Sequence, residues 1–182
     1  MLAEILKDDR FYFSVSATTR SPREGEEDGV NYHFLSRETF EKNIAADKML
    51  EYAEYCGNYY GTLRDEVEKR LDAGIDVILE IEVQGALKVK EKCPEALMIF
   101  VIPPSVGELK RRLLKRGTET EEVINSRVAR AAEEIPFAAK YDYIIVNDAL
   151  EDAVSDFRAV IKAERLKSEY AAEKLDEVIK NA

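Results

Sequence analysis

The sequence contains no tryptophan, two cysteines, Cys56 and Cys93, and a single histidine, His33. Two cysteines form no disulfide framework, and together with one histidine they do not supply the four ligands of a structural zinc site. These shortages argue against metal sites built on histidine and cysteine, and against catalytic triads that depend on histidine.

Basic residues are outnumbered, with 27 lysines and arginines against 37 acidic residues and a net charge of −10. An overall basic nucleic-acid binder is therefore excluded, although a local basic patch is not. No stretch approaches the roughly 18 consecutive apolar residues that span a membrane. The opening MLAEILKDDRF carries three acids and lacks the apolar region of a signal peptide. We expect a cytoplasmic protein that has neither a membrane nor a nucleic acid as its partner, and the oligomeric state stays open.

What is present suits one globular domain with small insertions: 182 residues, of which 46% are hydrophobic and 35% charged. A chain of this length buries roughly 70% of the surface that its unfolded form exposes, so it can build a sizeable core. The apolar content is normal, which argues against disorder.

Three apolar runs, 76–83, 97–102 and 143–146, are separated by segments with helical patterns. Continuous runs of this kind are typical of parallel strands covered on both faces. A fourth strand is expected over 11–17. The chain is therefore predicted to be an α/β protein with a ligand crevice at the carboxyl ends of its strands.

Helix ends are indicated by capping residues. Ser36 and Thr62 are predicted N-caps, and Ser105 with Glu108 is predicted to form a capping box on a helix that ends at Gly117. Further elements are expected as follows: a short strand over 30–34, two short strands over 49–60, a helix over about 121–139 that Pro136 bends or ends, and a last helix from about 150.

The loop after the first strand carries Arg20 and Arg23 on either side of Pro22. Two guanidinium groups can clamp a phosphate dianion, which favours an anionic small ligand. The alternative is a solvated loop whose arginines pair with the acids within 24–27, and the loop alone leaves both interpretations open.

The segment 51–62 combines four tyrosines with Glu51 and Thr62. It offers phenol, carboxylate and hydroxyl groups to a ligand, but tyrosines on strands are usually packing residues. Thr62 has a structural alternative as well, as the helix cap.

Glu80 and Glu82 are predicted to lie on one face at the end of a buried strand. Acids there need a partner, and a hydrated Mg²⁺ fits, with an arginine or a helix N-terminus as alternatives. The charged segment 115–130, with Arg116, Arg127 and Arg130, suits a mobile lid or, taken alone, a solvated helical surface.

Together these motifs resemble the guanylate kinase family over nearly the whole chain. The residues that carry the resemblance are, in order, SVSATTRSPREGE, DGVNYHF, EYAEYCGNYYGT, ILEIEVQGA, VIPPS, KRGTETEE and YIIVND. The resemblance implies transfer of the γ-phosphoryl group of ATP to GMP with Mg²⁺. It also implies a P-loop nucleoside monophosphate kinase-like, three-layer α/β core with a parallel sheet. The core would comprise 1–17 and 76–182, with a lid at about 116–128, and a mixed α+β GMP-binding insertion would comprise 18–75.

Roles follow from the resemblance residue by residue. The positions that match GMP-binding residues are Ser16, Arg20, Arg23, Glu26, Tyr32, Glu51, Tyr60, Thr62 and Glu82. Arg20, Arg116 and Arg127 match catalytic arginines, and Arg116, Arg127 and Asn147 match the ATP side. Arg130 is a further lid candidate. Glu80 and Glu82 match acids that contact the magnesium through water.

One part of the family pattern is missing from these 182 residues. None of the eight glycines is followed by lysine, so the sequence contains no G-x-x-x-x-G-K-[ST] phosphate loop. We expect that a first, central strand and this loop, roughly two dozen residues in all, are absent before Met1. The strands at 77–82 and 98–102 should then not be paired with each other, and activity should be impaired.

This absence leaves a second hypothesis. The chain would be a guanylate-kinase-like binding module or a pseudoenzyme, which recognises GMP or a phosphorylated partner without catalysis. Glu51, Thr62, the acids at 80 and 82 and the lid arginines count against a pure phosphopeptide binder, which does not need them.

Overall fold

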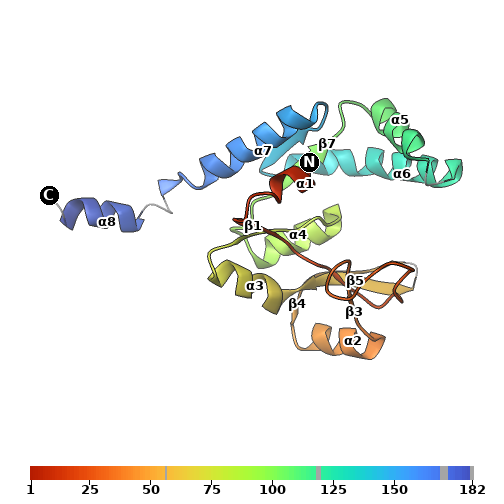
Figure 1. Ribbon diagram of the computed structural model, residues 1–182, viewed down its shortest axis with the longest axis horizontal. Coiled ribbons are helices and arrows are strands. Elements are labelled where there is room, and N and C mark those ends of the chain that lie inside the picture. Colours follow the sequence, from red (N-terminus) through yellow and green to blue (C-terminus); the bar gives the residue numbers. More distant parts are fainter. Residues whose placement is uncertain (56, 118–119, 169–171, 181–182) are drawn as a thin grey trace. The chain divides into compact units, whose positions relative to one another are not determined.

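A computed structural model describes residues 1–55, 57–117, 120–168 and 172–180 (Figure 1). The chain divides into two compact units, one comprising 2–98 and the other comprising Met1 with 99–182. These units group the chain differently from the predicted kinase core and GMP-binding insertion, and that functional division stays a prediction. Among the described residues, no helix is both long enough and apolar enough to cross a membrane.

The first unit begins with α1 (Leu2–Ile5) and a two-stranded parallel sheet. Strand β1 (Phe11–Phe13) pairs with β6 (Asp76–Ile78), with Tyr12 opposite Val77. Helix α3 (Arg64–Asp72) directly precedes β6 and packs against it. The parallel pairing brings residues far apart in sequence to the same sheet, as the apolar runs predict.

A four-stranded sheet with the order β3-β2-β5-β4 forms the rest of this unit. β4 and β5 are an antiparallel hairpin, and β2 pairs antiparallel with β5 and parallel with β3. The strands are β2 (Ala17–Thr18), β3 (His33–Phe34), β4 (Met49–Tyr55) and β5 (Asn58–Leu63). Ala17, Phe40 and Met49 form a buried cluster, in which α2 (Arg37–Ala45) supplies Phe40. The hairpin around Gly57-Asn58 confirms the sequence prediction.

Helix α4 (Val83–Lys92) packs against β4 within the same unit. Gly61 lies in β5 where the backbones of β4 and β5 approach closely. A Cβ built on Gly61 would lie 2.5 Å from the backbone oxygen of Glu51. Glycine at this position therefore permits the close approach of β5 to β4.

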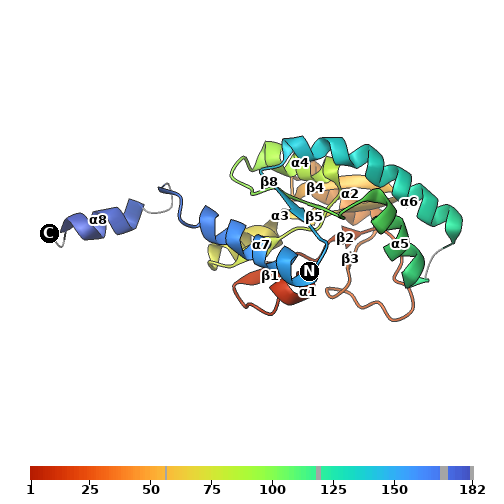
Figure 2. The ribbon, with the colours of Figure 1, turned by 90° about the horizontal axis from the view of Figure 1, so that it is seen from above.

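The second unit contains the parallel pair β7 (Ile99–Ile102) and β8 (Tyr143–Val146), with Ile99 opposite Tyr143. Helices α5 and α6 pack side by side, and α7 packs on β8 (Figure 2). The helices of this unit are α5 (Val106–Arg116), α6 (Glu121–Glu134), the 3-10 helix η1 (Ile135–Lys140), α7 (Leu150–Glu164) and α8 (Ala172–Lys180). Pro136 lies in η1, so the helix predicted over 121–139 changes geometry where proline was expected to end it.

Two predicted caps are confirmed and one is wrong. The hydroxyl of Ser36 accepts from the amide of Thr39 at 3.1 Å, and that of Ser105 accepts from the amide of Glu108 at 3.0 Å. Gly117 ends α5 with a φ of 67°. Thr62 is not a cap: Leu63 occupies the N-cap of α3, and Thr62 lies inside β5. Among the described residues, the capping box at Ser105 has only the hydrogen bond from the Glu108 amide to the Ser105 hydroxyl. The carboxylate of Glu108 binds arginines instead of the Ser105 amide.

Three predicted strands are shorter than their apolar runs, and the run over 97–102 gives β7 only from Ile99. The run over 76–83 gives β6 up to Ile78, and Glu82 becomes the N-cap of α4. Glu80 and Glu82 therefore do not share one face of a strand, because the helix begins before the apolar pattern ends. The segment 11–17 likewise divides between β1 and β2, which belong to different sheets.

Within their own units, β6 pairs with β1 and β7 pairs with β8. Because β6 and β7 belong to different units, the expectation that 77–82 and 98–102 are not paired with each other stays a prediction.

Candidate functional site

Glu51 is the centre of the strongest candidate site. Its position on β4 faces Thr62 on β5, and the two residues are 6% and 1% exposed. The Thr62 hydroxyl donates to Oε1 of Glu51 over 2.8 Å. Strand pairing thus places a carboxylate and a hydroxyl together in a buried position.

Burial raises the pKa of Glu51, because the charged carboxylate loses its hydration. The hydrogen bond from Thr62 and the positive charge of Lys88 oppose this rise, and the negative charge of Glu82 adds to it. Glu82 at the start of α4 therefore acts electrostatically on Glu51, although the two carboxylates come from different elements. A ligand that donates hydrogen bonds to Glu51 would relieve the cost of ionising it.

Arg20 forms the second part of the candidate site. Its Nη2 lies 2.9 Å from Oε1 of Glu26, and the two side chains are 16% and 18% exposed. The other carboxylate oxygen of Glu26 accepts from the backbone amide of Arg23 at 2.7 Å. The hydrogen bond from Arg20 is the main cause that lowers the pKa of Glu26. Glu26 thus holds the loop that carries Arg20 and Arg23 in place. An ion pair within this loop and the binding of an anion by its arginines are therefore compatible interpretations.

Aromatic side chains surround the Arg20 guanidinium. Its carbon lies 5.5 Å from the ring centroid of Tyr32 and 5.8 Å from that of Phe34. The rings of Tyr32 and Tyr60 meet edge-on with centroids 6.1 Å apart. Arg20, Tyr32 and Tyr60 therefore come together from a loop and from β5, and their polar ends can serve one anion.

The residues predicted to bind GMP all belong to the unit 2–98. Ser16 lies beside this sheet, and its backbone oxygen accepts from the amide of His33 at 2.9 Å. Arg23 is exposed in the loop, and Glu82 lies at the N-cap of α4. The structure thus gathers these positions around one small sheet and the start of one helix.

The residues predicted for the ATP side belong to the other unit, 99–182. Arg116 is the last residue of α5, and Arg127 is exposed on α6, as is Arg130. Residues 118–119 of the predicted lid, 116–128, lie outside the described residues. Asn147 follows β8, where its amide donates to the oxygen of Ile102 at 2.7 Å.

Arg112 contributes to this unit although no sequence motif indicates a role for it. Its Nη1 donates to the backbone oxygen of Asn147 at 2.6 Å, and its Nε donates to Glu108 at 2.6 Å. This side chain therefore fastens the turn after β8 to α5. Arg112 and Asn147 are separated by 35 positions in the sequence, so no local pattern indicates their contact.

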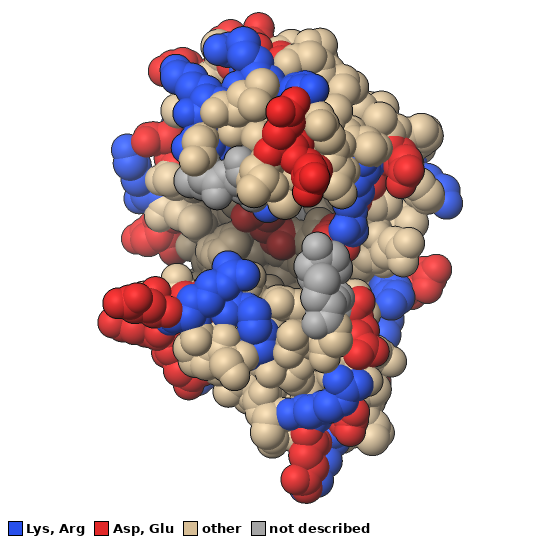
Figure 3. All heavy atoms as spheres, turned by 90° about the vertical axis from the view of Figure 1, so that its right-hand side faces the viewer, with Lys and Arg blue, Asp and Glu red and all other residues tan. Residues whose placement is uncertain are grey.

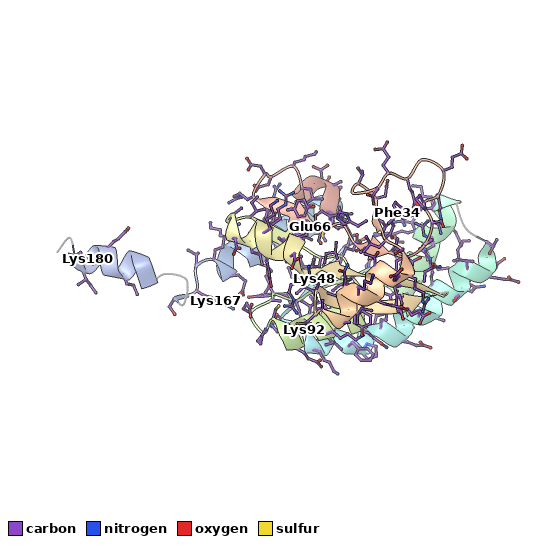
Figure 4. The ribbon with its side chains drawn as sticks, turned by 90° about the horizontal axis from the view of Figure 1, so that it is seen from below. Phe34, Lys48, Glu66, Lys92, Lys167 and Lys180 are labelled. Carbon is purple, nitrogen blue, oxygen red and sulfur yellow. The ribbon has the colours of Figure 1, made fainter. Side chains whose placement is uncertain are left out.

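His33 was also given little weight, and the structure places it in a side-chain network. Its Nε2 lies 2.7 Å from Oε2 of Glu66, and the Tyr12 hydroxyl donates to Oε1 of the same residue. Glu66 on α3 and Phe34, the neighbour of His33 on β3, are labelled in Figure 4. The network joins β1, β3 and α3 beside the predicted phosphate end of the site.

Within the described residues, no group of three or more histidine, cysteine, aspartate or glutamate side chains could hold a metal ion. Glu80 is exposed between β6 and α4, and Glu82 follows it. Two carboxylates suit Mg²⁺ that keeps its waters and is bound mainly by nucleotide phosphates. On the face shown in Figure 3, basic and acidic side chains are interspersed.

The guanylate kinase family model matches residues 2–164. The chain is 54% identical over 172 residues to the guanylate kinase of Halalkalibacterium halodurans, covering 94% of this chain and 84% of that protein. It is 52% identical over 174 residues to that of Thermus thermophilus, covering 96% and 79%. The crystal structure of guanylate kinase from Anaplasma phagocytophilum matches with a TM-score of 0.73 and 36% identity, covering 91% of this chain and 81% of that one.

Together with this structural match, the parallel strand pairs and their helices define an α/β protein of the P-loop nucleoside monophosphate kinase-like fold. Within that class, the chain belongs to the guanylate kinase family.

Proposed function

We propose that this chain binds GMP in the unit 2–98 as the acceptor for the γ-phosphoryl group of ATP. The buried pair of Glu51 and Thr62 is the observation that carries the proposal. Guanine presents adjacent N1–H and N2–H donors, which a carboxylate can accept together. Adenine has an acceptor at N1, so it would leave the carboxylate of Glu51 unpaired and would be rejected. Thr62 and Ser16 supply hydroxyl contacts to the base, with Thr62 near O6, and Glu82 lies on the guanine side.

The phosphate of GMP is assigned to the arginine and tyrosine cluster. Arg20 offers a guanidinium fork that Glu26 holds in place. Arg23, Tyr32 and Tyr60 complete the set of donors. Bidentate contacts from arginine suit a dianion better than lysine would, because the planar fork matches two phosphate oxygens.

Phosphoryl transfer in this proposal needs no covalent intermediate. Arg20, Arg116 and Arg127 stabilise charge on the phosphates, and closure of the lid excludes water. Mg²⁺ bound with ATP supplies neutralising charge on the phosphate oxygens. Glu80 and Glu82 would hold its waters, and Asn147 would contact adenine.

The 182 residues contain no G-x-x-x-x-G-K-[ST] motif, so they do not themselves supply its amide cradle and lysine. We therefore expect slow phosphoryl transfer by this chain on its own. The alternative function is that of a binding module or pseudoenzyme, which recognises GMP or a phosphorylated partner without catalysis.

Titration calorimetry with GMP, AMP and a phosphoserine peptide, followed by a coupled assay of ADP release, separates these functions. GMP binding with strong preference over AMP supports the acceptor site, and equal binding of both nucleotides contradicts it. Measurable turnover favours the kinase over the binding module. Binding of the phosphopeptide in preference to GMP would favour the binding module.

A further inference from the structure

Helix α4 brings a glycine into contact distance of the Glu51 carboxylate. Gly85 is buried in the first half of α4, and a Cβ built on it would lie 2.9 Å from Oε2 of Glu51 and 3.4 Å from its Cδ. Real Cβ atoms do not approach other atoms so closely, so a larger residue would displace the carboxylate. The other oxygen, Oε1, is held by Thr62. The two oxygens of Glu51 are thus constrained from two different elements.

Lys88 lies one helical turn further along α4. Its Nζ donates to the backbone oxygen of Tyr52, the neighbour of Glu51, over 3.0 Å, and lies 5.4 Å from the Tyr52 ring centroid. These contacts hold a positive charge beside the buried end of β4. The charge of Lys88 lowers the pKa of Glu51 against the effects of burial and of Glu82, which raise it.

We propose that α4 is the positioning element for the guanine-recognition carboxylate, with Gly85 fixing the place of Oε2 and Lys88 supplying the opposing charge. The proposal rests on the proposed function and adds two residues that determine specificity for guanine. The groups that act on Glu51 are Thr62 from β5, and Glu82 and Lys88 from the start and middle of α4.

Gly85 provides a signature that a merely structural glycine would not show. Alanine favours helix more than glycine does, so an internal glycine replaced by alanine normally stabilises a helix. Gly107 on α5 is the matched control, because a Cβ there would meet only Ser105 Oγ, at 3.7 Å. In Gly85→Ala, the clash between the new Cβ and the Glu51 carboxylate should oppose the stabilisation that alanine normally gives a helix.

The first test is a double-mutant cycle in the absence of nucleotide, with Gly85→Ala, Glu51→Ala and both together. We expect Gly85→Ala to lower the melting temperature of the otherwise unsubstituted chain, and to lower it less or raise it in the Glu51→Ala background. Gly107→Ala should behave alike in both backgrounds. Equal effects of Gly85→Ala in both backgrounds would overturn the contact on which the proposal depends.

The second test measures the carboxylate itself. Carbon-13 NMR of labelled glutamate should show a higher pKa of Glu51 in Lys88→Gln, and Lys88→Arg should restore it. The exposed Lys162 on α7 supplies the control variant Lys162→Gln, which should leave the titration unchanged. An unchanged pKa of Glu51 in Lys88→Gln would overturn the role given to Lys88.

Nucleotide binding then tests specificity. By calorimetry, Gly85→Ala should weaken GMP binding roughly tenfold or more, and Lys88→Gln should weaken it more at low pH than at high pH. Unchanged GMP affinity in both variants would overturn the proposal. If the unsubstituted chain does not bind GMP, the proposed function is wrong, while the stability cycle and the titration still decide whether α4 positions Glu51.

Discussion

Thr62 donates its hydroxyl hydrogen bond to Oε1 of Glu51 across the β4–β5 hairpin, over 2.8 Å and within the interior of the sheet. The contact fixes the direction of a carboxylate that burial makes expensive to ionise. The hydrogen bonds from Thr62 and the positive charge of Lys88 do not fully offset the cost of burying this carboxylate, because its pKa stays raised. This relationship suits a carboxylate that gains a further hydrogen-bond donor from a ligand.

The first prediction concerns stability and pH. Burial raises the pKa of Glu51, so the folded chain keeps a proton that the unfolded chain has already released. This contribution to stability is present below the ordinary pKa of glutamate and is lost as the pH rises through the raised pKa. Glu51→Gln does not titrate there, so its unfolding free energy should increase relative to that of the unsubstituted chain as the pH rises above the ordinary pKa of glutamate. Denaturant unfolding measures the difference, and a difference that stays constant with pH would contradict it.

The second prediction concerns the phosphate end of the site. Arg20→Lys keeps the charge but loses the planar fork, so GMP binding should weaken roughly tenfold or more. Binding of guanosine, which has no phosphate, should be nearly unchanged. Arg10→Lys, at an exposed pair with Asp8, is the matched control. Equal losses for GMP and guanosine in calorimetry would show that Arg20 does not contact the phosphate.

The third prediction concerns the lone histidine. His33→Ala removes the contact with Glu66, which joins β3 to α3, and should cost about 1 kcal/mol of unfolding free energy. Amide exchange over 30–34 should become faster, because this segment loses its attachment. Lys42→Gln, which breaks an exposed ion pair with Glu38, should change neither quantity appreciably. Unchanged exchange in His33→Ala would refute the attachment.

The fourth prediction concerns α5. Hydrogen bonds from Arg111 and then Arg112 lower the pKa of Glu108 to about 2. The stabilisation is present above the ordinary pKa of glutamate and is lost as the pH falls through about 2. Glu108→Gln should therefore be less stable than the unsubstituted chain at neutral pH, and the two should converge on acidification. Thermal unfolding against pH measures this, and a gap that persists at the lowest pH would contradict the role of these ion pairs.

The sequence predicted the parts of the fold that depend on local signals. Ser36 and Ser105 cap helices because a short polar side chain before an apolar pattern satisfies free amides. Thr62 has the same local signal, yet strand pairing with Glu51 determines its role. The pairing of Thr62 with Glu51 in the sheet therefore overrides the preference of threonine for a helix N-cap.

The site shows the same limit. Glu51, Arg20 and their neighbours could be selected because their chemistry fits a nucleotide and their motifs resemble a family. Gly85 and His33 could not, because their importance lies in contacts with Glu51 and Glu66 that are far away in sequence. Apolar periodicity likewise did not show that the strand before Glu80 ends at Ile78.

Titration calorimetry of Glu51→Gln with GMP and AMP is the decisive test of guanine recognition by Glu51. A carboxamide has one accepting oxygen, and an NH2 group that only donates takes the place of the other oxygen. It therefore cannot accept hydrogen bonds from both guanine N–H groups side by side. GMP affinity should fall roughly 10- to 100-fold, and the weak affinity for AMP should not fall. GMP affinity equal to that of the unsubstituted chain would contradict recognition of guanine by Glu51.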